Sequence, residues 1–266
     1  MKIIIATVII AFVIAFVLGM LLGFFKKVFA VHEDEKVTKI KELLPNGNCG
    51  GCGYAGCSAY AEAVASGKAP LNACTAGGAE VAKAIAEIMG GTAEVKSYIA
   101  VLACQGSKTC AVSRGNYTGV ETCAAAAIAV NGTKMCASGC IGFGDCVKVC
   151  KFGAMTMGED GLPKIDKAKC TGCGACARAC PHKLLKKIDT ERKAPLVLCS
   201  CVSDKKPDVV KNCSMSCIKC QRCVRECPEQ AITMEGGVPF INEEKCTACG
   251  TCVTACLRKV IKFLEK

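Results

Sequence analysis

The sequence has few of the residues that build a large apolar core. It contains no tryptophan, four tyrosines, nine phenylalanines and two histidines in 266 residues. Side-chain packing alone leaves such a chain short of stabilisation, so something else must hold it together. The two histidines, His32 and His182, are expected to face solvent. No Ser/His/Asp arrangement and no paired carboxylates are visible, which argues against a hydrolytic site.

Cysteine is the residue that the sequence has in excess, with 26 copies. Such a content is typical either of disulfides in an oxidising compartment or of metal and cluster ligands in a reducing one. The formal charge of +11 also fits clusters, because each [4Fe–4S] unit with four thiolates carries about −2. Five clusters would bring the chain close to neutrality. No basic run with interleaved aromatic residues is present, so we predict no nucleic-acid partner.

The N-terminal end has an uncharged, apolar stretch from Ile3 to Phe25, followed by Lys26 and Lys27. This length predicts a helix that crosses a membrane once. A buried soluble helix is the first alternative, but the rest of the chain is too polar to surround it. A cleaved signal peptide is the second, but the lysines stand on the wrong side of the apolar run. Their position predicts a body on the cytoplasmic side of the inner membrane, where disulfides are rare.

A small domain with four cysteines is predicted after a charged linker. The motif reads "NCGGCGYAGC", and helices are expected over 58–67 and 79–89, each ended by glycine. Two turns around a short helix would gather the four thiols into a cage for one cluster. The candidate ligands are Cys49, Cys52, Cys57 and Cys74.

Three glycines in this motif, Gly51, Gly53 and Gly56, also match the G-x-G-x-x-G dinucleotide fingerprint. The match is spurious, because no strand precedes it and no βαβ unit surrounds it. Glycine here lets the backbone approach a cluster closely. We find no nucleotide or flavin motif elsewhere in the sequence.

The remainder of the sequence is an internal repeat. Residues 134–170 resemble residues 211–246, and each half has a cysteine motif, a strand-like "AMTM" or "AITM", a glycine turn and a second cysteine motif. C-x2-C-x2-C-x3-C occurs without gaps at Cys170, Cys217 and Cys246. This spacing is typical of bacterial ferredoxins, in which the fourth cysteine ligates the other cluster. Structural zinc is the main alternative, but it leaves the third and fourth cysteines unexplained.

If the fourth cysteine of each motif ligates the cluster held by the other motif of the same module, the ligand sets of both modules follow. The second module has Cys217, Cys220 and Cys223 with Cys256, and Cys246, Cys249 and Cys252 with Cys227. The first module has Cys170, Cys173 and Cys176 with Cys150, and an incomplete set of Cys140, Cys146 and Cys180.

The incomplete set has Phe143 where its second cysteine should stand. Cys136 is the nearest free thiol, and we predict that it supplies the missing ligand. The alternative is that Cys136 joins other thiols in a separate cluster and leaves a three-thiolate [3Fe–4S] site. Six cysteines then remain unassigned, either as ligands of a sixth cluster or as buried apolar residues. They are Cys104, Cys110, Cys123, Cys199, Cys201 and Cys213. At least five [4Fe–4S] clusters are therefore expected, with a sixth left open.

The order of these parts resembles the B subunit of the Rnf complex, in the longer form with two ferredoxin modules. The resemblance rests on the apolar N-terminal segment, "LPNGNCGGCGYAGC" and the repeated cysteine motifs. It implies an electron relay within an ion-translocating ferredoxin:NAD⁺ oxidoreductase, with soluble reduced ferredoxin as donor. NAD⁺ reduction and ion movement would belong to the other membrane and peripheral subunits.

Two other functions stay open on sequence grounds: an electron-transfer subunit of a hydrogenase or formate-linked membrane complex, and a membrane-tethered redox sensor. The expected fold class is α+β, with one transmembrane helix, a four-cysteine domain and two tandem ferredoxin-like (βαβ)2 modules. The expected boundaries are 1–27 for the anchor, 28–45 for the linker, 46–91 for the four-cysteine domain, 98–189 for module 1 and 193–266 for module 2.

Overall fold

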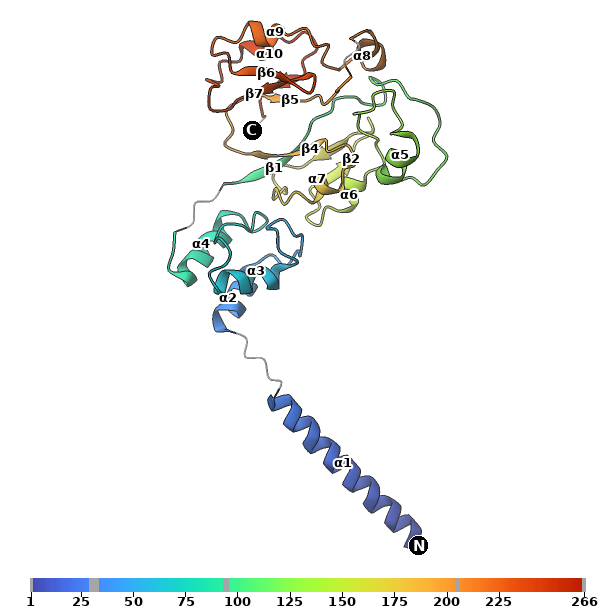
Figure 1. Ribbon diagram of the computed structural model, residues 1–266, viewed down its shortest axis with the longest axis vertical. Coiled ribbons are helices and arrows are strands. Elements are labelled where there is room, and N and C mark those ends of the chain that lie inside the picture. Colours follow the sequence, from blue (N-terminus) through green and yellow to red (C-terminus); the bar gives the residue numbers. More distant parts are fainter. Residues whose placement is uncertain (1, 29–33, 93–95, 204–205, 265–266) are drawn as a thin grey trace.

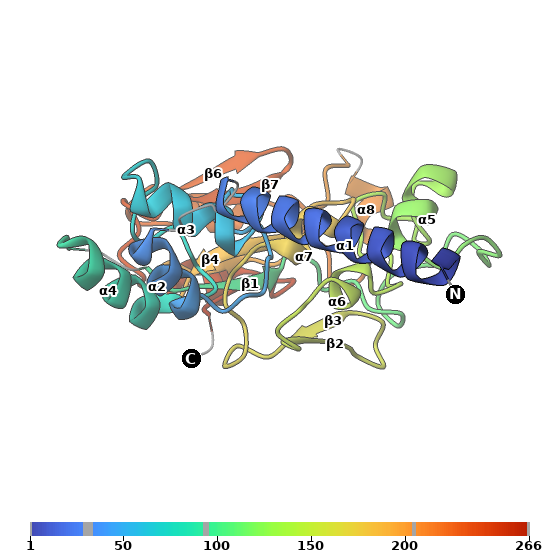
Figure 2. The same cartoon turned by 90° about the horizontal axis from the view of Figure 1, so that it is seen from below.

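The computed structural model describes residues 2–28, 34–92, 96–203 and 206–264. These residues form an N-terminal helix, a small helical domain and two modules built around short antiparallel strand pairs. Figure 1 shows the four parts following one another along the long axis of the molecule. Seen from below in Figure 2, the folded parts overlap behind the N-terminal helix. Residues 29–33, part of the expected linker, lie outside the described residues.

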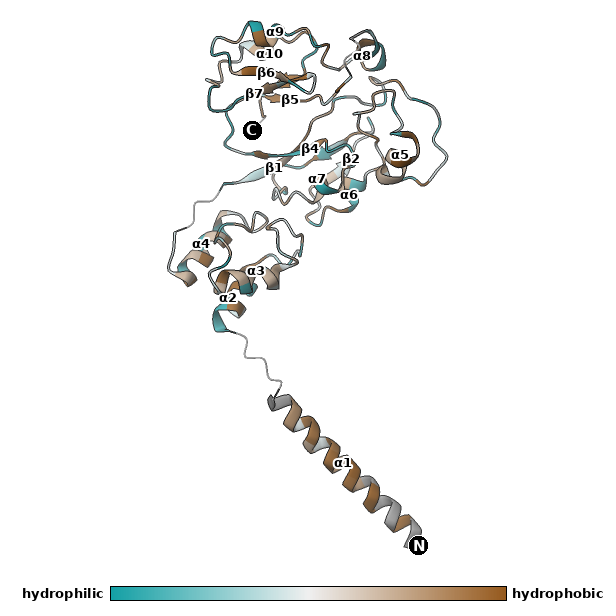
Figure 3. Cartoon of the chain, viewed as in Figure 1, coloured by the Kyte–Doolittle hydropathy of each residue, from teal (hydrophilic) through white to brown (hydrophobic). Residues whose placement is uncertain are grey.

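Helix α1 (Lys2–Val28) extends away from the folded parts. Its large apolar side chains, described over part of its length, are exposed, and the part of the helix that is coloured by hydropathy in Figure 3 is mostly apolar. Over the described residues, no helix combines the length and the apolar character that a membrane crossing requires. The transmembrane helix expected over 1–27 is therefore not confirmed.

The small domain consists of three helices packed around one apolar core. Asp34 caps the first of them by accepting a hydrogen bond from the N–H of Lys36 at 3.0 Å. Ile40, Tyr60 and Ile85 are buried in the core, and each large apolar side chain buried in this way contributes about 1.5–3 kcal/mol. The helices are α2 (Glu35–Leu43), α3 (Cys57–Ala65) and α4 (Gly78–Met89).

Each module contains two antiparallel strand pairs. In both modules the first strand pairs with the last, and the two middle strands form a hairpin. The hairpin of module 2 turns at Gly236 and Gly237, whose positive φ angles of 54° and 81° suit a tight two-residue turn. In module 1 the strands are β1 (Tyr98–Leu102), β2 (Met155–Met157), β3 (Pro163–Ile165) and β4 (Leu185–Asp189). In module 2 they are β5 (Leu196–Val197), β6 (Ile232–Glu235), β7 (Val238–Ile241) and β8 (Ile261–Lys262).

Each cysteine motif of the modules contains a short helix that carries the cysteine of its third position, and a longer segment of module 1 adds one more helix. The motif helices are α6 (Asp145–Lys148), α7 (Ala175–Ala179), α9 (Arg222–Arg225) and α10 (Thr251–Ala255). The added helix, α5 (Cys123–Val130), begins where Thr122 Oγ1 accepts a hydrogen bond from the N–H of Ala125 at 3.2 Å. Module 2 carries α8 (Lys206–Asn212) before its first motif. The sequence patterns did not predict α5.

The three folded parts are joined by hydrogen bonds to main-chain atoms. Arg178 Nη2 donates to the carbonyl oxygen of Cys49 at 2.7 Å, which joins the small domain to module 1. The main chain of module 1 near Ala111 pairs with Cys213 of module 2, and the N–H of Val112 donates to Asn212 O at 2.9 Å. A cysteine residue therefore takes part in the contact between the small domain and module 1 and in the contact between the two modules.

Candidate iron–sulfur cluster sites

All 26 cysteines are free thiols, so the structure has no disulfide framework. The thiols gather in groups, several of them around cavities. Within the described residues, no group of three or more His, Cys, Asp or Glu side chains is placed to hold a single metal ion.

The N-terminal site is a cavity in the small domain. Asn48 Oδ1 accepts a hydrogen bond from the N–H of Cys57 at 2.8 Å, which fixes the start of α3 beside the cavity. Burial raises the pKa of Cys74, and repulsion by the neighbouring thiols raises it further. The structure brings together the four residues expected from the sequence, Cys49, Cys52, Cys57 and Cys74.

Module 2 holds two groups of thiols with the fourth cysteine crossed between them. Site 2A is a cavity lined by Cys217, Cys220, Cys223 and Cys256. Site 2B consists of Cys227, Cys246, Cys249 and Cys252. Burial raises the pKa of Cys252 to about 11, and the other three thiols of site 2B add to the shift by charge repulsion. Both groups correspond to the sets expected from the ferredoxin spacing.

Site 1A of module 1 also follows the expected set: Cys150, Cys170, Cys173 and Cys176. Burial raises the pKa of Cys176 to about 11, with repulsion by Cys170 and Cys173 adding to the shift. The N–H of Ala100, on β1, donates to the sulfur of Cys170 at 3.4 Å. The first strand of the module therefore supports the loop that carries these thiols.

Site 1B completes the incomplete set in a way that the sequence analysis missed. Its cavity is lined by Cys123, Cys140, Cys146 and Cys180. Burial raises the pKa of Cys146 to about 12, and Cys123 is the thiol that adds most to this shift. Cys123 is the first residue of α5, so this helix delivers the fourth thiol.

The structure does not place Cys136 with Cys140, Cys146 and Cys180, because Cys136 does not line the cavity of site 1B. Phe143, which stands in the place of the missing cysteine, packs against Tyr117 with ring centroids 5.6 Å apart. Both rings lie in the apolar cluster that buries Cys123. The only sequence signal was the Thr-Cys pair before an alanine-rich run, which marks the start of a helix.

Cys136 belongs instead to a central site between the modules. This cavity is lined by five thiols: Cys104, Cys136, Cys199, Cys201 and Cys213. A hydrogen bond between Cys136 and Cys201 raises the pKa of the first thiol and lowers that of the second. Cys110 lies nearby but outside the lining, with its pKa lowered by a hydrogen bond to Ser107.

Unpartnered polar atoms test whether these sites fit a cluster. Within the described residues, five buried side-chain atoms have no hydrogen-bond partner: Thr75 Oγ1, Gln105 Oε1, Asp145 Oδ1, Thr171 Oγ1 and His182 Nε2. Each belongs to a residue next to, or two positions from, a cysteine of these sites. Buried polar groups are normally satisfied, and the two threonine hydroxyls could donate to cluster sulfurs. Thiolates with polar atoms beside them are the surroundings that an iron–sulfur cluster requires.

His182 is therefore not the solvent-facing residue that was expected. It lines the cavity of site 1B, and its Nδ1 lies 2.7 Å from the carbonyl oxygen of Gly139.

Gly51 does not have the role of a nucleotide-binding glycine. A Cβ atom on it would lie 2.7 Å from the carbonyl oxygen of Cys173, so only glycine allows the two domains to approach.

The sites form one continuous series. The N-terminal site adjoins site 1A through Gly51 and Cys173. Sites 1A and 1B share module 1, and the N–H of Cys140 in site 1B donates to Cys104 Sγ of the central site at 3.5 Å. The N–H of Cys217 in site 2A donates to Cys199 Sγ of the central site at 3.4 Å. Sites 2A and 2B share module 2, so no gap separates one end of the series from the other.

Comparison with known proteins identifies the same parts. The family described as "Putative Fe-S cluster" matches residues 44–76. The family described as "4Fe-4S dicluster domain" matches twice, at residues 139–184 and 216–260. The chain thus has an iron–sulfur domain followed by two ferredoxin domains.

Relatives match over most of the chain. The B subunit of the ion-translocating oxidoreductase complex of Methanosarcina acetivorans is 40% identical over 238 residues, covering 89% of each chain. The chain belongs to the family of B subunits of ion-translocating oxidoreductase complexes. The B subunit of the Na⁺-translocating ferredoxin:NAD⁺ oxidoreductase complex of Acetobacterium woodii is also 40% identical, over 86% of this chain and 69% of its own. The proton-translocating counterpart of Clostridium ljungdahlii is 39% identical, over 91% of this chain and 86% of its own.

Membership of this B-subunit family confirms the resemblance found in the sequence. The chain is an iron–sulfur electron-transfer subunit of a redox enzyme complex. The corresponding protein of Rhodobacter capsulatus matches only 31% of this chain, although it is 41% identical where it matches. Our chain therefore has the longer form of the subunit.

Proposed function

We propose that this chain receives electrons from reduced ferredoxin and passes them through six clusters to partner subunits that reduce NAD⁺ and translocate an ion. The proposal is supported by relatives whose names state that they act on ferredoxin and NAD⁺. The observation that carries it is the unbroken series of thiol groups from site 2B to the N-terminal site. When bound, a [4Fe–4S] cluster supplies one-electron chemistry at low potential.

Five of the clusters would be held by four-thiol sets. They are the N-terminal site and sites 1A, 1B, 2A and 2B, as defined above, with Cys123 in place of Cys136 at site 1B. In each module the crossed fourth cysteine ties two distant loops to one cluster.

The sixth cluster would lie at the central site. A cubane needs four thiolates at separate corners, and this cavity is lined by five thiols. Cys136 and Cys201 are hydrogen-bonded to each other, so we infer that one of them is a ligand and the other supports it. Cys104, Cys199 and Cys213 supply the other three corners. Cys104 comes from module 1, whereas Cys199 and Cys213 come from module 2, so the cluster would bridge the modules.

The exposed cysteines indicate where the chain receives electrons from a soluble donor. Among the described cysteines only Cys220 and Cys249 are exposed, and they belong to sites 2A and 2B. A soluble ferredoxin could approach clusters there, because electron transfer needs a short distance between donor and acceptor. The opposite end of the series lies in the small domain, which follows α1 (Figure 1). Electrons would therefore run from module 2 towards the N-terminal part.

We also infer that α1 attaches the chain to the membrane with its body on the cytoplasmic side. The support is the exposed apolar character of α1 and the lysines, Lys26 and Lys27, that follow the apolar stretch. Partner subunits of the complex would then supply the nucleotide site and the ion pathway.

The test uses the full chain, solubilised in detergent and reconstituted without oxygen. Mixing with stoichiometric reduced ferredoxin in a stopped-flow instrument should bleach the clusters rapidly, with several electrons taken up by each chain. A control with a chemical reductant shows that the clusters can be reduced at all. Intact, reducible clusters that ferredoxin leaves oxidised would overturn the proposal.

Arg178 provides a test of the junction between site 1A and the N-terminal site. Its hydrogen bond to Cys49 O spans the two domains, and such a bond is worth about 1 kcal/mol. We expect Arg178→Met to speed amide hydrogen exchange over residues 46–56 about fivefold. Arg225 provides the control, since it stands two residues before the fourth cysteine of a C-x2-C-x2-C-x3-C motif in module 2, as Arg178 does in module 1, and is exposed. Equal exchange in the two variants would contradict the contact.

A further inference from the structure

Lys134 is a buried cation in a chain whose other charges are mostly at the surface. Its exposed fraction is 7%, and Lys219 is the other charged residue buried in the described part. Lysine is almost never buried unless something compensates its charge. The sequence repeat makes this burial specific. Lys134 stands two residues before Cys136, and Lys211 stands two residues before Cys213, yet Lys211 is exposed.

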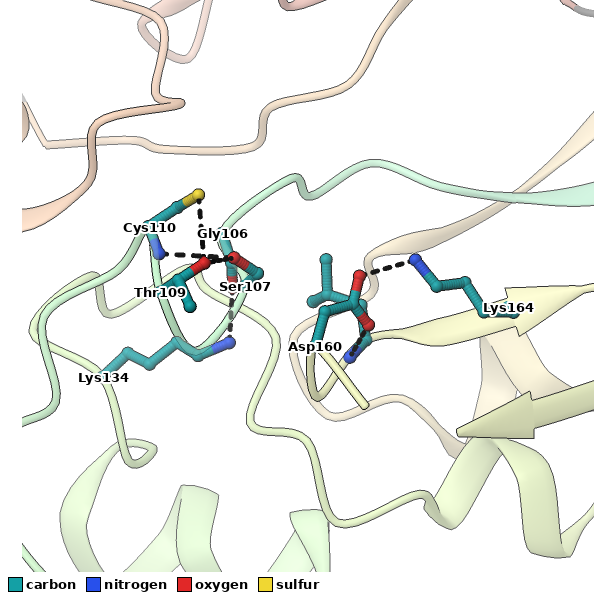
Figure 4. A network of polar contacts seen from close by, with 8 residues as sticks. Gly106, Ser107, Thr109, Cys110, Lys134, Asp160 and Lys164 are labelled. Carbon is teal, nitrogen blue, oxygen red and sulfur yellow. Dashed lines mark hydrogen bonds and ion pairs between the residues drawn. The ribbon is translucent and has the colours of Figure 1, made fainter. Parts of the chain in front are cut away.

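The ammonium of Lys134 is held by a backbone carbonyl. Nζ donates to Gly106 O at 2.6 Å, and Figure 4 shows the side chain directed at that carbonyl. Asp160, drawn in the same figure, is paired with Lys164 at 2.6 Å instead. None of the ion pairs found between described residues includes Lys134. A neutral carbonyl does not offset the cost of burying a positive charge.

Lys134 lies near the thiols of both the central site and site 1B. It lines the cavity of the central site, and its partner Gly106 lies against the sulfurs of that site. A Cβ on Gly106 would be 3.5 Å from Cys213 Sγ and 3.6 Å from Cys104 Sγ. Lys134 also acts on Cys140 of site 1B. Burial and the nearby thiol of Cys104 raise the pKa of Cys140, and the charge of Lys134 opposes them.

Lys219, the second buried lysine, does not line the central site itself. It lines the cavity of site 2A, and its exposed fraction is also 7%. Its charge acts on Cys201 of the central site, in addition to the hydrogen bond from Cys136. A buried lysine therefore lines the central site, and a second one lines site 2A.

We propose that Lys134 and Lys219 are charge-compensating residues that raise the reduction potentials of the central cluster and of its neighbours at sites 1B and 2A. The inference rests on the six-cluster relay proposed above. A cluster with four thiolates gains one negative charge when it is reduced, and a buried ammonium nearby stabilises that charge strongly in a low dielectric. The lysines thereby hold the clusters at the module junction reducible, and the ammonium of Lys134 gains the negative partner that burial demands.

The test is an EPR-monitored redox titration of the reconstituted full chain and four variants. Lys134→Gln keeps a donor for Gly106 O but removes the charge, and Lys134→Arg restores the charge. We expect Lys134→Gln to lower the reduction potentials of the central cluster and of the cluster at site 1B by about 59 mV each. This shift corresponds to a tenfold change in the equilibrium constant for one-electron reduction. Lys219→Gln should lower two potentials, of which one is shared with Lys134→Gln. The control, Lys211→Gln, should change none.

The outcomes separate this inference from the proposed function. Unchanged potentials in Lys134→Gln at wild-type iron content, or an equal shift in Lys134→Arg, would overturn the role of the charge. Loss of iron from both Lys134 variants would also overturn it, because the residue would then be structural. Loss from Lys134→Gln alone would support it. An iron content of about 20 rather than 24 atoms in the wild type would refute the six-cluster relay, while the potential of site 1B still tests Lys134.

Discussion

Replacing Cys123 by serine should remove the cluster of site 1B, whereas replacing Cys136 should leave it in place. Cys123 lines the site 1B cavity with Cys140, Cys146 and Cys180, and Cys136 does not. Because a cubane needs its fourth thiolate, we expect Cys123→Ser to lower the iron content by about one to four atoms per chain. The smaller loss corresponds to a [3Fe–4S] product, which has a distinctive EPR signal in its oxidised form.

Iron analysis and EPR of the reconstituted full chain check this prediction. Cys136→Ser is the matched control for site 1B. It makes the same cysteine-to-serine change at the residue that the sequence predicted as the fourth ligand, whereas Cys123 is the residue that the structure places there. A [3Fe–4S] signal in Cys136→Ser together with a normal spectrum in Cys123→Ser would restore the assignment expected from the sequence and contradict the structure.

The second large effect concerns the central site. A double replacement, Cys104→Ser with Cys199→Ser, removes one thiol from each module and should abolish the cluster between them. Ferredoxin should still reduce the clusters of module 2. Transfer onward to module 1 and to the N-terminal site should fall more than about tenfold, which corresponds to about 1.4 kcal/mol or more of added barrier.

Rapid freezing followed by EPR resolves this, since it reports which clusters have been reduced at each time. Cys110→Ser is the control, because Cys110 lies near the central site but outside its lining. Undiminished reduction of module 1 in the double variant, with the iron of the central site shown to be lost, would mean that electrons take another route.

The sequence predicted four of the thiol groups because their spacing is a local property. Three neighbouring thiols, with a fourth just after the short helix that carries the third, can be recognised in a single stretch of residues. The crossing of Cys227 and Cys256 follows from the same pattern once the fold is that of a ferredoxin.

Site 1B and the central site depend on contacts that spacing does not encode. Cys123 reaches site 1B only because α5 folds back onto the first module, and its burial depends on the packing of Tyr117 and Phe143. The central site joins Cys104 to Cys213, whose segments pair only after the two modules dock. Proximity in sequence therefore favoured Cys136 for site 1B, whereas the structure places Cys123 there. Burial of Lys134 and His182 was hidden for the same reason, since both lie in walls made by distant segments.

The crossed cysteines also set an order for assembly during synthesis of the chain. Cys49 to Cys74 are made early and within one short stretch, so the N-terminal site can take up iron as soon as its domain leaves the ribosome. Site 2A must wait, because Cys217, Cys220 and Cys223 meet Cys256 only after β8 has been made and has paired with β5. The central site waits longer still, for both modules to fold. Cells that run short of iron would therefore fill the chain from its N-terminal end, and the incomplete molecules would lack the exposed clusters that face a soluble donor.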